Sequence, residues 1–300
     1  MKGKVLAWFS GKRRMWVIAG IFVVFIGLGL VIYRVTGHQI GIRALAVRVL
    51  HTVRAIADRG IVRRDNLGQY TDIIFLHHSV GYNLIEDGNV RTAFLENGYH
   101  FWDHDYNDPG LRDSFGVSRG YSYSVPDDNT DPDGLANIFS QPVYDLPLNT
   151  FSALLQHEVI MVKSCFPNSA ITSEEELAGD QANYRKMRAA IQAHPEKIFV
   201  ILTSPPLIPE ETNPADAARA RAMADWLISE DFKAGNRNIF VFDFYHLLAE
   251  SDLSSPEVNM LRSDYRNGSD SHPNRAANQA VAPQLVSFVI QSIQAYKTGR

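Results

Sequence analysis

The chain has 300 residues, of which 45% are hydrophobic and 21% charged, a composition typical of a folded globular protein. Its net charge of −4 hides two opposite parts. Residues 1–64 carry twelve Lys and Arg against one acid, a net of +11, whereas residues 65–300 carry 17 basic and 32 acidic residues, a net of −15. A body this acidic lacks the basic surface that a phosphate backbone requires, which argues against nucleic-acid binding. The single cysteine, Cys165, excludes an intramolecular disulfide and a multi-cysteine zinc site.

The basic part contains a candidate membrane segment. Residues 15–33 are 19 consecutive uncharged residues, long enough to cross the hydrocarbon core of a bilayer. More basic residues precede this segment than follow it closely, so the positive-inside rule places residues 1–14 in the cytoplasm and the body outside. We expect an uncleaved anchor rather than a signal peptide, because no A-x-A cleavage site follows directly. Residues 34–64 predict a basic amphipathic linker that either lies on anionic headgroups or packs on the body.

The acidic body, residues 65–300, reads as one α/β domain. Four near-continuous apolar runs at residues 72–76, 159–163, 198–202 and 239–242 are typical of parallel strands buried on both faces. A weaker run at residues 100–103 predicts an edge strand. Helices are expected over residues 82–97, from the capping box at Ser173 to near His194, from Asn213-Pro214 to Asp231, and after Pro273 with a possible kink at Pro283. This alternation predicts a three-layer α/β/α sandwich.

One long stretch, residues 104–157, interrupts this alternation. It contains no convincing helix or strand pattern and is rich in Asp, Asn, Gly and Pro. A long irregular insertion in a compact domain is usually functional or disordered. This one follows a predicted strand, where doubly wound folds build their sites.

Three residues at predicted strand ends suggest nucleophilic catalysis. Ser79 directly follows the first strand, although a serine there can also be a simple helix N-cap. Asp270 and His272 lie in the loop that opens the last helix, on the same expected edge of the sheet. Nucleophile, orienting acid and base would therefore converge. Asn168, after the third strand, can either donate to an oxyanion or stabilise an Asx-turn.

Together with the TSPP stretch at residues 203–206, these blocks resemble the SGNH, or GDSL-type, hydrolase superfamily. The resemblance implies a flavodoxin-like sheet of five parallel strands ordered 2-1-3-4-5 and hydrolysis of lipid or acetylated-carbohydrate esters without a cofactor. It implies that Ser79 is the nucleophile, His272 the base and Asp270 the acid. The oxyanion donors would be Asn168 and Gly110, with Gly116 and Gly120 as alternatives to Gly110. The further expected substrate contacts are His78, Asp105 and Asn107.

The sequence departs from the superfamily pattern in two blocks. His77-His78-Ser79 replaces the usual Gly-Asp-Ser, and the last block reads D-x-H rather than D-x-x-H. The serine and the histidine are therefore firmer assignments than the acid. Ser269, Asp264 or a Ser-His dyad without an acid remain alternatives to Asp270.

Other functions fit some of the same residues. Histidines and acids near the predicted edge could instead hold a catalytic metal, giving a metal-dependent hydrolase; these are His77, His78, Asp103, His104, Asp105, Asp270 and His272. Asn129, Asp131 and Asp133 have the spacing of a calcium loop, but Ser140 at its twelfth position excludes an EF-hand. An O-acyltransferase with the same triad and an inactive carbohydrate-binding module are further alternatives. We expect a membrane-anchored, extracytoplasmic serine esterase acting on an acylated envelope carbohydrate or lipid.

Overall fold

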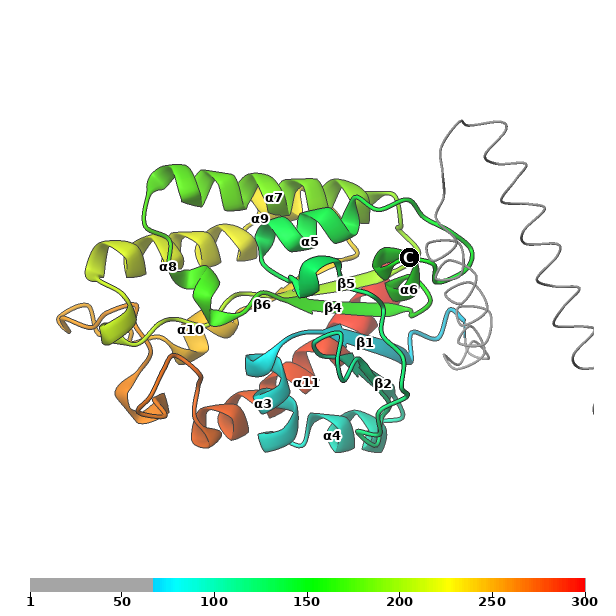
Figure 1. Cartoon of the computed structure of the whole chain (residues 1–300), viewed down its shortest axis with the longest axis horizontal. Helices are drawn as coiled ribbons and strands as arrows, with labels where there is room; N and C mark the ends of the chain where they lie inside the picture. The colour runs from blue at the N-terminus through cyan, green and yellow to red at the C-terminus, as the bar shows by residue number, and fades with distance from the viewer. Residues whose placement is uncertain (1–66, 300) are drawn as a thin grey trace, which may run out of the picture. The chain divides into compact units, whose positions relative to one another are not determined.

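The computed structural model describes residues 67–299, in which a six-stranded sheet lies between two layers of helices (Figure 1). Its strands are β1 (Asp72–Leu76), β2 (His100–His104), β3 (Leu111–Arg112), β4 (Val159–Lys163), β5 (Ile198–Leu202) and β6 (Ile239–Phe242). The spatial order is β3-β2-β1-β4-β5-β6, and all neighbours are parallel except β3, which runs antiparallel to β2. The five parallel strands thus follow the expected 2-1-3-4-5 order. The expectation of only five strands was wrong, because β3 adds an edge.

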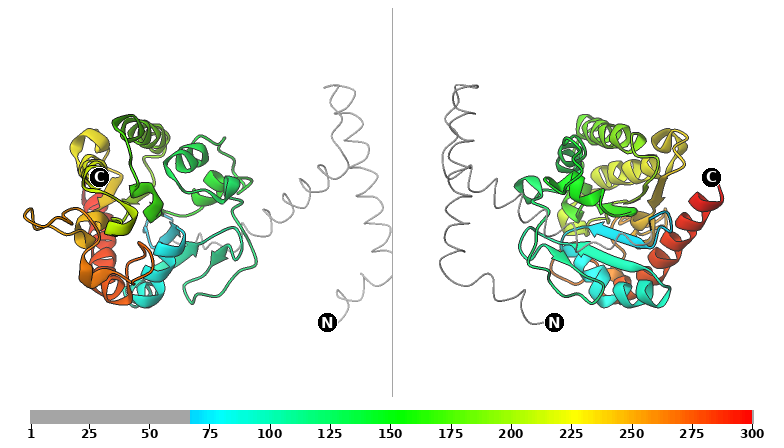
Figure 2. Two further views of the ribbon diagram at one scale, coloured as in Figure 1. Left: turned by 60° about the vertical axis from the view of Figure 1, so that its left-hand side comes forward. Right: turned by 90° about the vertical axis from the view of Figure 1, so that its right-hand side faces the viewer.

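The two helical layers lie on opposite faces of the sheet (Figure 2, right) and bury them. One layer contains α3 (Ser79–Asp87), α4 (Val90–Glu96), α10 (Phe244–Leu248) and α11 (Arg275–Thr298). The other contains α5 (Pro132–Phe139), α6 (Thr150–Leu154), α7 (Glu174–Gln192), α8 (Pro214–Ile228) and α9 (Glu230–Lys233). In β1, Ile73 and Phe75 face the first layer, whereas Ile74 and Leu76 face the second. Because both faces are covered, the central strands have continuous apolar sequences.

Three helices begin where the capping residues indicate. The Ser173 side chain accepts a hydrogen bond from the Glu176 N–H at the start of α7. Asn213 does the same for the first turn of α8, and Asn274 for that of α11. α11 then continues through Pro283 and is one helix of 24 residues.

Several predicted element boundaries were wrong. The single helix expected over residues 82–97 is two helices, since Gly88 and Asn89 separate α3 from α4 and Asn89 adopts a left-handed φ of 54°. The helix expected to reach Asp231 ends at Ile228, and the short α9 follows it. β2 is not an edge strand, because the two-residue β3 pairs with its outer side.

The insertion at residues 104–157, in whose sequence no helix or strand pattern is evident, is structured. It contains β3, α5 and α6 and a 3₁₀ turn, η2 (Pro126–Asp128). α5 buries six of its eight residues against the second layer, where it packs along α7. The helices α5 and α6 escaped prediction because each is too short for a helical period to be distinguished from chance. The strand β3 has only two residues, too few to show an alternating pattern.

The expected cytoplasmic tail at residues 1–14, the anchor at 15–33 and the linker at 34–64 lie outside the described residues. Within residues 67–299, no helix is both long enough and apolar enough to cross a membrane.

Candidate active site

The candidate nucleophile is placed by the turn that leaves β1. Ser79 is the first residue of α3, and His78, in extended conformation, is the N-cap residue. Ser79 is therefore not the N-cap of this helix. Its Oγ lies 2.7 Å from Nε2 of His272 and 3.6 Å from Sγ of Cys165, which precedes a 3₁₀ turn, η3 (Phe166–Ser169). The strand-to-helix turn thus holds a hydroxyl at the carboxyl edge of the sheet within hydrogen-bond distance of an imidazole.

His272 is oriented by Asp270, two residues earlier in the same loop. Oδ1 of Asp270 lies 2.9 Å from Nδ1 of His272 and also accepts the backbone N–H of His272 at 2.9 Å. Because a carboxylate can only accept, Nδ1 carries the ring proton and Nε2 is left as the acceptor that faces Ser79. Partial burial acts to raise the pKa of Asp270, but hydrogen bonds from Asn267 and His272 outweigh it and hold this pKa below its ordinary value.

The D-x-H spacing therefore permits an acid–histidine pair within one loop. The two alternative acids have other partners: Asp264 pairs with Arg262 at 2.8 Å, and the Ser269 hydroxyl donates to Asn267. The Phe166 ring meets the His272 ring edge-on, with centroids 4.8 Å apart, and packs against it.

Asn168, the expected oxyanion donor, lies on η3 with its amide already occupied. Nδ2 donates to Oδ1 of Asp131 at 2.9 Å and to the backbone oxygen of Cys165 at 3.1 Å. Both amide hydrogens are used, so in this conformation Asn168 can bind an oxyanion only by exchanging one of these acceptors for it.

The glycines expected to assist Asn168 are also occupied. The Gly110 N–H donates to the Tyr106 carbonyl at 2.8 Å, and Gly110 has a φ of +73°. A Cβ at this position would lie 2.4 Å from the Tyr121 carbonyl oxygen, which accounts for the glycine structurally. The Gly116 and Gly120 N–H groups donate to the Asp113 carbonyl and the Ser118 hydroxyl. None of the three N–H groups is free for an oxyanion. The first turn of α3 offers N–H groups beside Ser79 instead, because a helix leaves its first N–H groups without internal partners.

Of the three expected substrate contacts, two are engaged within the fold. Asp105 accepts the Tyr106 N–H and lies 3.4 Å from the Arg112 guanidinium. Asn107 bonds both backbone groups of Val125 and thereby holds two parts of the insertion together. His78, the third, is buried, with its ring stacked on Tyr106 and its Nδ1 3.3 Å from Oγ1 of Thr130.

A buried group of charged side chains behind Ser79 was missed as a functional element. Nε2 of His77 lies 3.3 Å from Oδ2 of Asp103, and Nδ1 lies 2.9 Å from the His78 carbonyl oxygen. Arg91 donates to Asp103 at 2.8 Å and also pairs with Glu86. Burial alone would raise the pKa of Asp103, but His77 and Arg91 hold it below the ordinary value. In the sequence, His77 and Asp103 stand out only as candidate metal ligands, and nothing in it indicates that Arg91 joins them.

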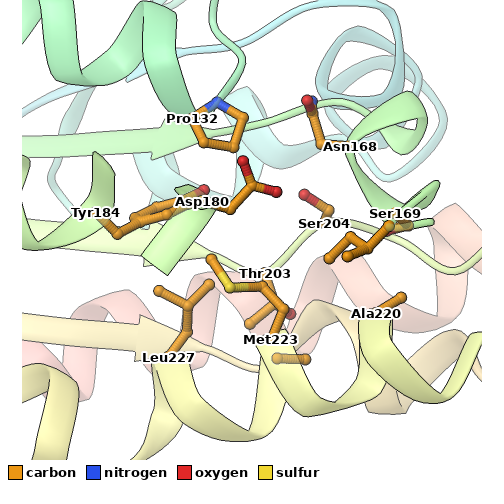
Figure 3. A pocket seen from close by; sticks show the side chains of 12 residues that line it. Pro132, Asn168, Ser169, Asp180, Tyr184, Thr203, Ser204, Ala220, Met223 and Leu227 are labelled. Carbon is orange, nitrogen blue, oxygen red and sulfur yellow. The ribbon is translucent and has the colours of Figure 1, made fainter. Parts of the chain in front are cut away.

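A small cavity of about 10 Å³, room for about one water molecule, lies behind Asn168 (Figure 3). The Asp180 carboxyl group lies among the lining side chains, between Pro132 and Asn168 on one side and Thr203 on the other. Burial, followed by the negative charges of Glu176, Asp133 and Asp131, raises the pKa of Asp180 to about 6.

The residues proposed as metal ligands do not gather into a metal site in the part of the chain that the structure describes. Over residues 67–299, no group of three or more His, Cys, Asp or Glu side chains is arranged to hold an ion. In the candidate calcium loop, Oδ1 of Asn129 accepts the Asp131 N–H, and Asp131 bonds Asn168. Asp133 lies in the first turn of α5. The spacing of this loop therefore serves the start of α5.

No family model matches the chain, and no curated protein is significantly similar to it. Solved structures do match. A proposed acylhydrolase from Bacteroides fragilis aligns with 82% of this chain and 96% of its own, with a TM-score of 0.50 and 12% identity. A GDSL-like lipase from Bacteroides thetaiotaomicron aligns with 81% and 96%, with a TM-score of 0.48 and 11% identity. A protein described as a proposed platelet activating factor from Streptococcus pneumoniae aligns with 82% and 99%, with a TM-score of 0.46 and 11% identity. The first of these alignments shows that this chain and the Bacteroides fragilis protein share a fold.

Proposed function

We propose that this chain is a serine ester hydrolase of the SGNH type that removes a short acyl group from an envelope carbohydrate or lipid. The observation that carries the proposal is the continuous series of hydrogen bonds from Ser79 through His272 to Asp270, with distances of 2.7 and 2.9 Å. Nucleophile, base and orienting acid in this order activate a hydroxyl for attack on a carbonyl carbon.

The chemistry follows from the protonation states. The Ser79 hydroxyl attacks the ester carbonyl while Nε2 of His272 takes its proton, and Asp270 stabilises the resulting imidazolium. The oxyanion accepts from N–H groups in the first turn of α3 and from Asn168, once Asn168 exchanges an acceptor. His272 then returns the proton to the leaving alcohol. Water, activated by the same imidazole, releases the acyl group from Ser79.

The test is ester hydrolysis by the purified full-length protein. We expect turnover of 4-nitrophenyl acetate, and we expect Ser79→Ala and His272→Ala each to lower kcat by at least about 1000-fold while the fold is retained. Asp270→Asn, which favours the other tautomer of His272, should lower kcat by a factor of the same order. A Ser79→Ala protein with the parental rate would refute the assignment. Acyl transfer to an added alcohol in preference to water would identify an O-acyltransferase instead.

We further propose that residues 15–33 anchor the protein and that the catalytic domain lies outside the cytoplasm. The uncharged run and the basic residues before it support this topology. An alkaline phosphatase fused after Arg300 should be active in intact cells. An inactive alkaline phosphatase fusion, together with an active fusion to a reporter that works only in the cytoplasm, would overturn the orientation.

A further inference from the structure

The loop that carries the candidate acid and base, residues 267–272, is buried at only one residue. Its ends are closed by an antiparallel bridge. The first three residues of the loop are exposed, and Asp270 and His272 are partly exposed, whereas Ser271 between them is fully buried, at 0%. An exposed loop has little apolar packing to hold it in place. Ser271 is therefore the residue through which this loop can be fastened to the domain.

The hydrogen bonds within the loop give it a shape but do not fix it on the sheet. The Asn267 side chain accepts two backbone N–H groups of the loop and donates to the Asp270 carboxylate. In the part of the chain that the structure describes, two groups of the loop form hydrogen bonds to other elements. One is the His272 ring, which contacts Ser79, and the other is the Ser271 hydroxyl.

The Ser271 hydroxyl bonds both ends of one turn. Its Oγ accepts the backbone N–H of Ile208 at 2.9 Å, and its hydrogen is donated to Oε2 of Glu211. Ile208 is the N-cap residue of the 3₁₀ turn η4 (Pro209–Glu211), and the Glu211 N–H donates to the Ile208 carbonyl at 3.0 Å. Because a backbone N–H only donates, the O–H hydrogen of Ser271 is left for the carboxylate.

The segment that leads into η4 is a rigid support. It begins after β5 with the TSPP stretch at residues 203–206, and Pro209 opens the turn itself, so three prolines restrict φ within seven residues. Carbonyl groups of this segment accept the Ser169 hydroxyl at 2.7 Å and the Leu261 N–H at 2.8 Å. The segment is thus held by two other parts of the domain, and a bond to it fixes the loop relative to the sheet.

We propose that Ser271 and Glu211 are positioning residues that hold His272 at the distance from Ser79 that proton transfer requires. This inference rests on the proposed hydrolase function and concerns the geometry of the same site. Proton transfer needs heavy atoms about 2.6–3.2 Å apart, and the observed 2.7 Å lies in this range, so a displacement of the loop by about 1 Å breaks the contact. The inference also explains the D-x-H spacing, because the single residue between acid and base fastens the loop.

The kinetic test measures kcat and KM for 4-nitrophenyl acetate in the full-length protein. Glu211 is exposed, so Glu211→Ala removes the acceptor without emptying a buried site. We expect kcat to fall about tenfold and KM to stay within about twofold, because His272 acts in both acylation and deacylation. Glu211→Gln retains an acceptor oxygen and should restore kcat to within about threefold of the parent. Ser271→Ala loses both bonds and should lower kcat about 100-fold.

Glu210→Ala is the matched control, because it removes the same charge from an exposed position of the same turn and should keep the parental kcat. Urea unfolding of the same preparations separates positioning from stability. Ser271→Ala leaves the buried Ile208 N–H without an acceptor and is expected to destabilise the protein, so Glu211→Ala is the deciding variant. A lower urea midpoint with the parental kcat in Glu211→Ala would show a purely structural bond and would overturn the inference.

An NMR experiment tests the inference even if the proposed hydrolase function fails. In full-length protein with ¹⁵N-labelled histidine, the shift of Nε2 of His272 reports its hydrogen bond with Ser79, so it should change when Ser79→Ala is introduced. This change should be much smaller in the Glu211→Ala background and of parental size in the Glu210→Ala background. A change of parental size in Glu211→Ala would overturn the inference. A protein that cleaves no ester but shows the smaller change would refute the proposed function and retain the positioning role.

Discussion

Gly81 is the position where a single methyl group is expected to damage the site most directly. It lies in the first turn of α3, two residues after Ser79. A Cβ at Gly81 would lie 2.4 Å from Cβ, 2.6 Å from Cγ and 2.9 Å from Nδ1 of His77. His77 is fully buried and bonded to both the His78 carbonyl and Asp103, so its ring has no free space to enter. The Gly81→Ala change must therefore move the start of α3.

The size of the effect follows from the distances. An ordinary contact begins at 3.4 Å, so the closest pair at 2.4 Å must separate by 1.0 Å. Overpacking of this kind costs about 1–3 kcal/mol, and the better helix propensity of alanine offsets up to about 1 kcal/mol of it. For catalysis, a misplacement of about 1 Å lowers the rate by about 100-fold. We therefore expect Gly81→Ala to lose about 1 kcal/mol of stability and about 100-fold in kcat.

The assay measures kcat for 4-nitrophenyl acetate and the urea midpoint of the same full-length preparations. Gly179→Ala is the matched control, because Gly179 lies inside α7 and a Cβ there would meet nothing within 4 Å. Alanine at Gly179 should stabilise the protein by about 0.5–1 kcal/mol and leave the rate unchanged. If Gly81→Ala keeps the parental kcat within twofold, the contact between His77 and the first turn of α3 does not position Ser79.

Three further perturbations test the surroundings of the site. The raised pKa of Asp180, about 6, means that the folded state binds its proton more tightly than the unfolded state. The stabilisation of the folded state by this tighter proton binding is present below about pH 4 and is lost as the pH rises through 6. Asp180→Asn should therefore be more stable than the parent at pH 8, by on the order of 1 kcal/mol, and should differ little from it at pH 4. Thermal unfolding of both proteins at the two pH values measures this difference. Arg91→Met leaves the buried Asp103 carboxylate with one cation fewer and should cost about 3–5 kcal/mol in urea unfolding. A loss below about 1 kcal/mol would show that the remaining partners of Asp103, His77 and Arg112, compensate its charge. Asn168→Ala should lower kcat about 100- to 1000-fold with KM little changed, and an unchanged kcat would remove Asn168 from the oxyanion site.

The parts of the fold that could be predicted are those in which a single segment contains its own signal. β1, β4 and β5 bury every residue, so their continuous apolar runs identify them without reference to their neighbours. The approach of Ser79 to His272 could also be expected, because the carboxyl ends of parallel strands meet at one edge of the sheet. The contact between Asn168 and Asp131 could not. It depends on where the start of α5 lies, and the sequence shows no clear signal for that helix.

The unusual first block, His77-His78-Ser79, has a physical explanation in the side chains on its two sides. His77 faces the first helical layer, where its Nε2 lies 3.3 Å from Oδ2 of the buried Asp103. Gly81 leaves room for that ring, so the histidine and the glycine require each other. His78 faces the opposite side, where its ring stacks on Tyr106 of the insertion and burial lowers its pKa. One histidine thus supports the start of the helix that carries Ser79, and the other packs against the insertion. A strand end followed by two residues of alternating direction can serve both purposes without moving the serine.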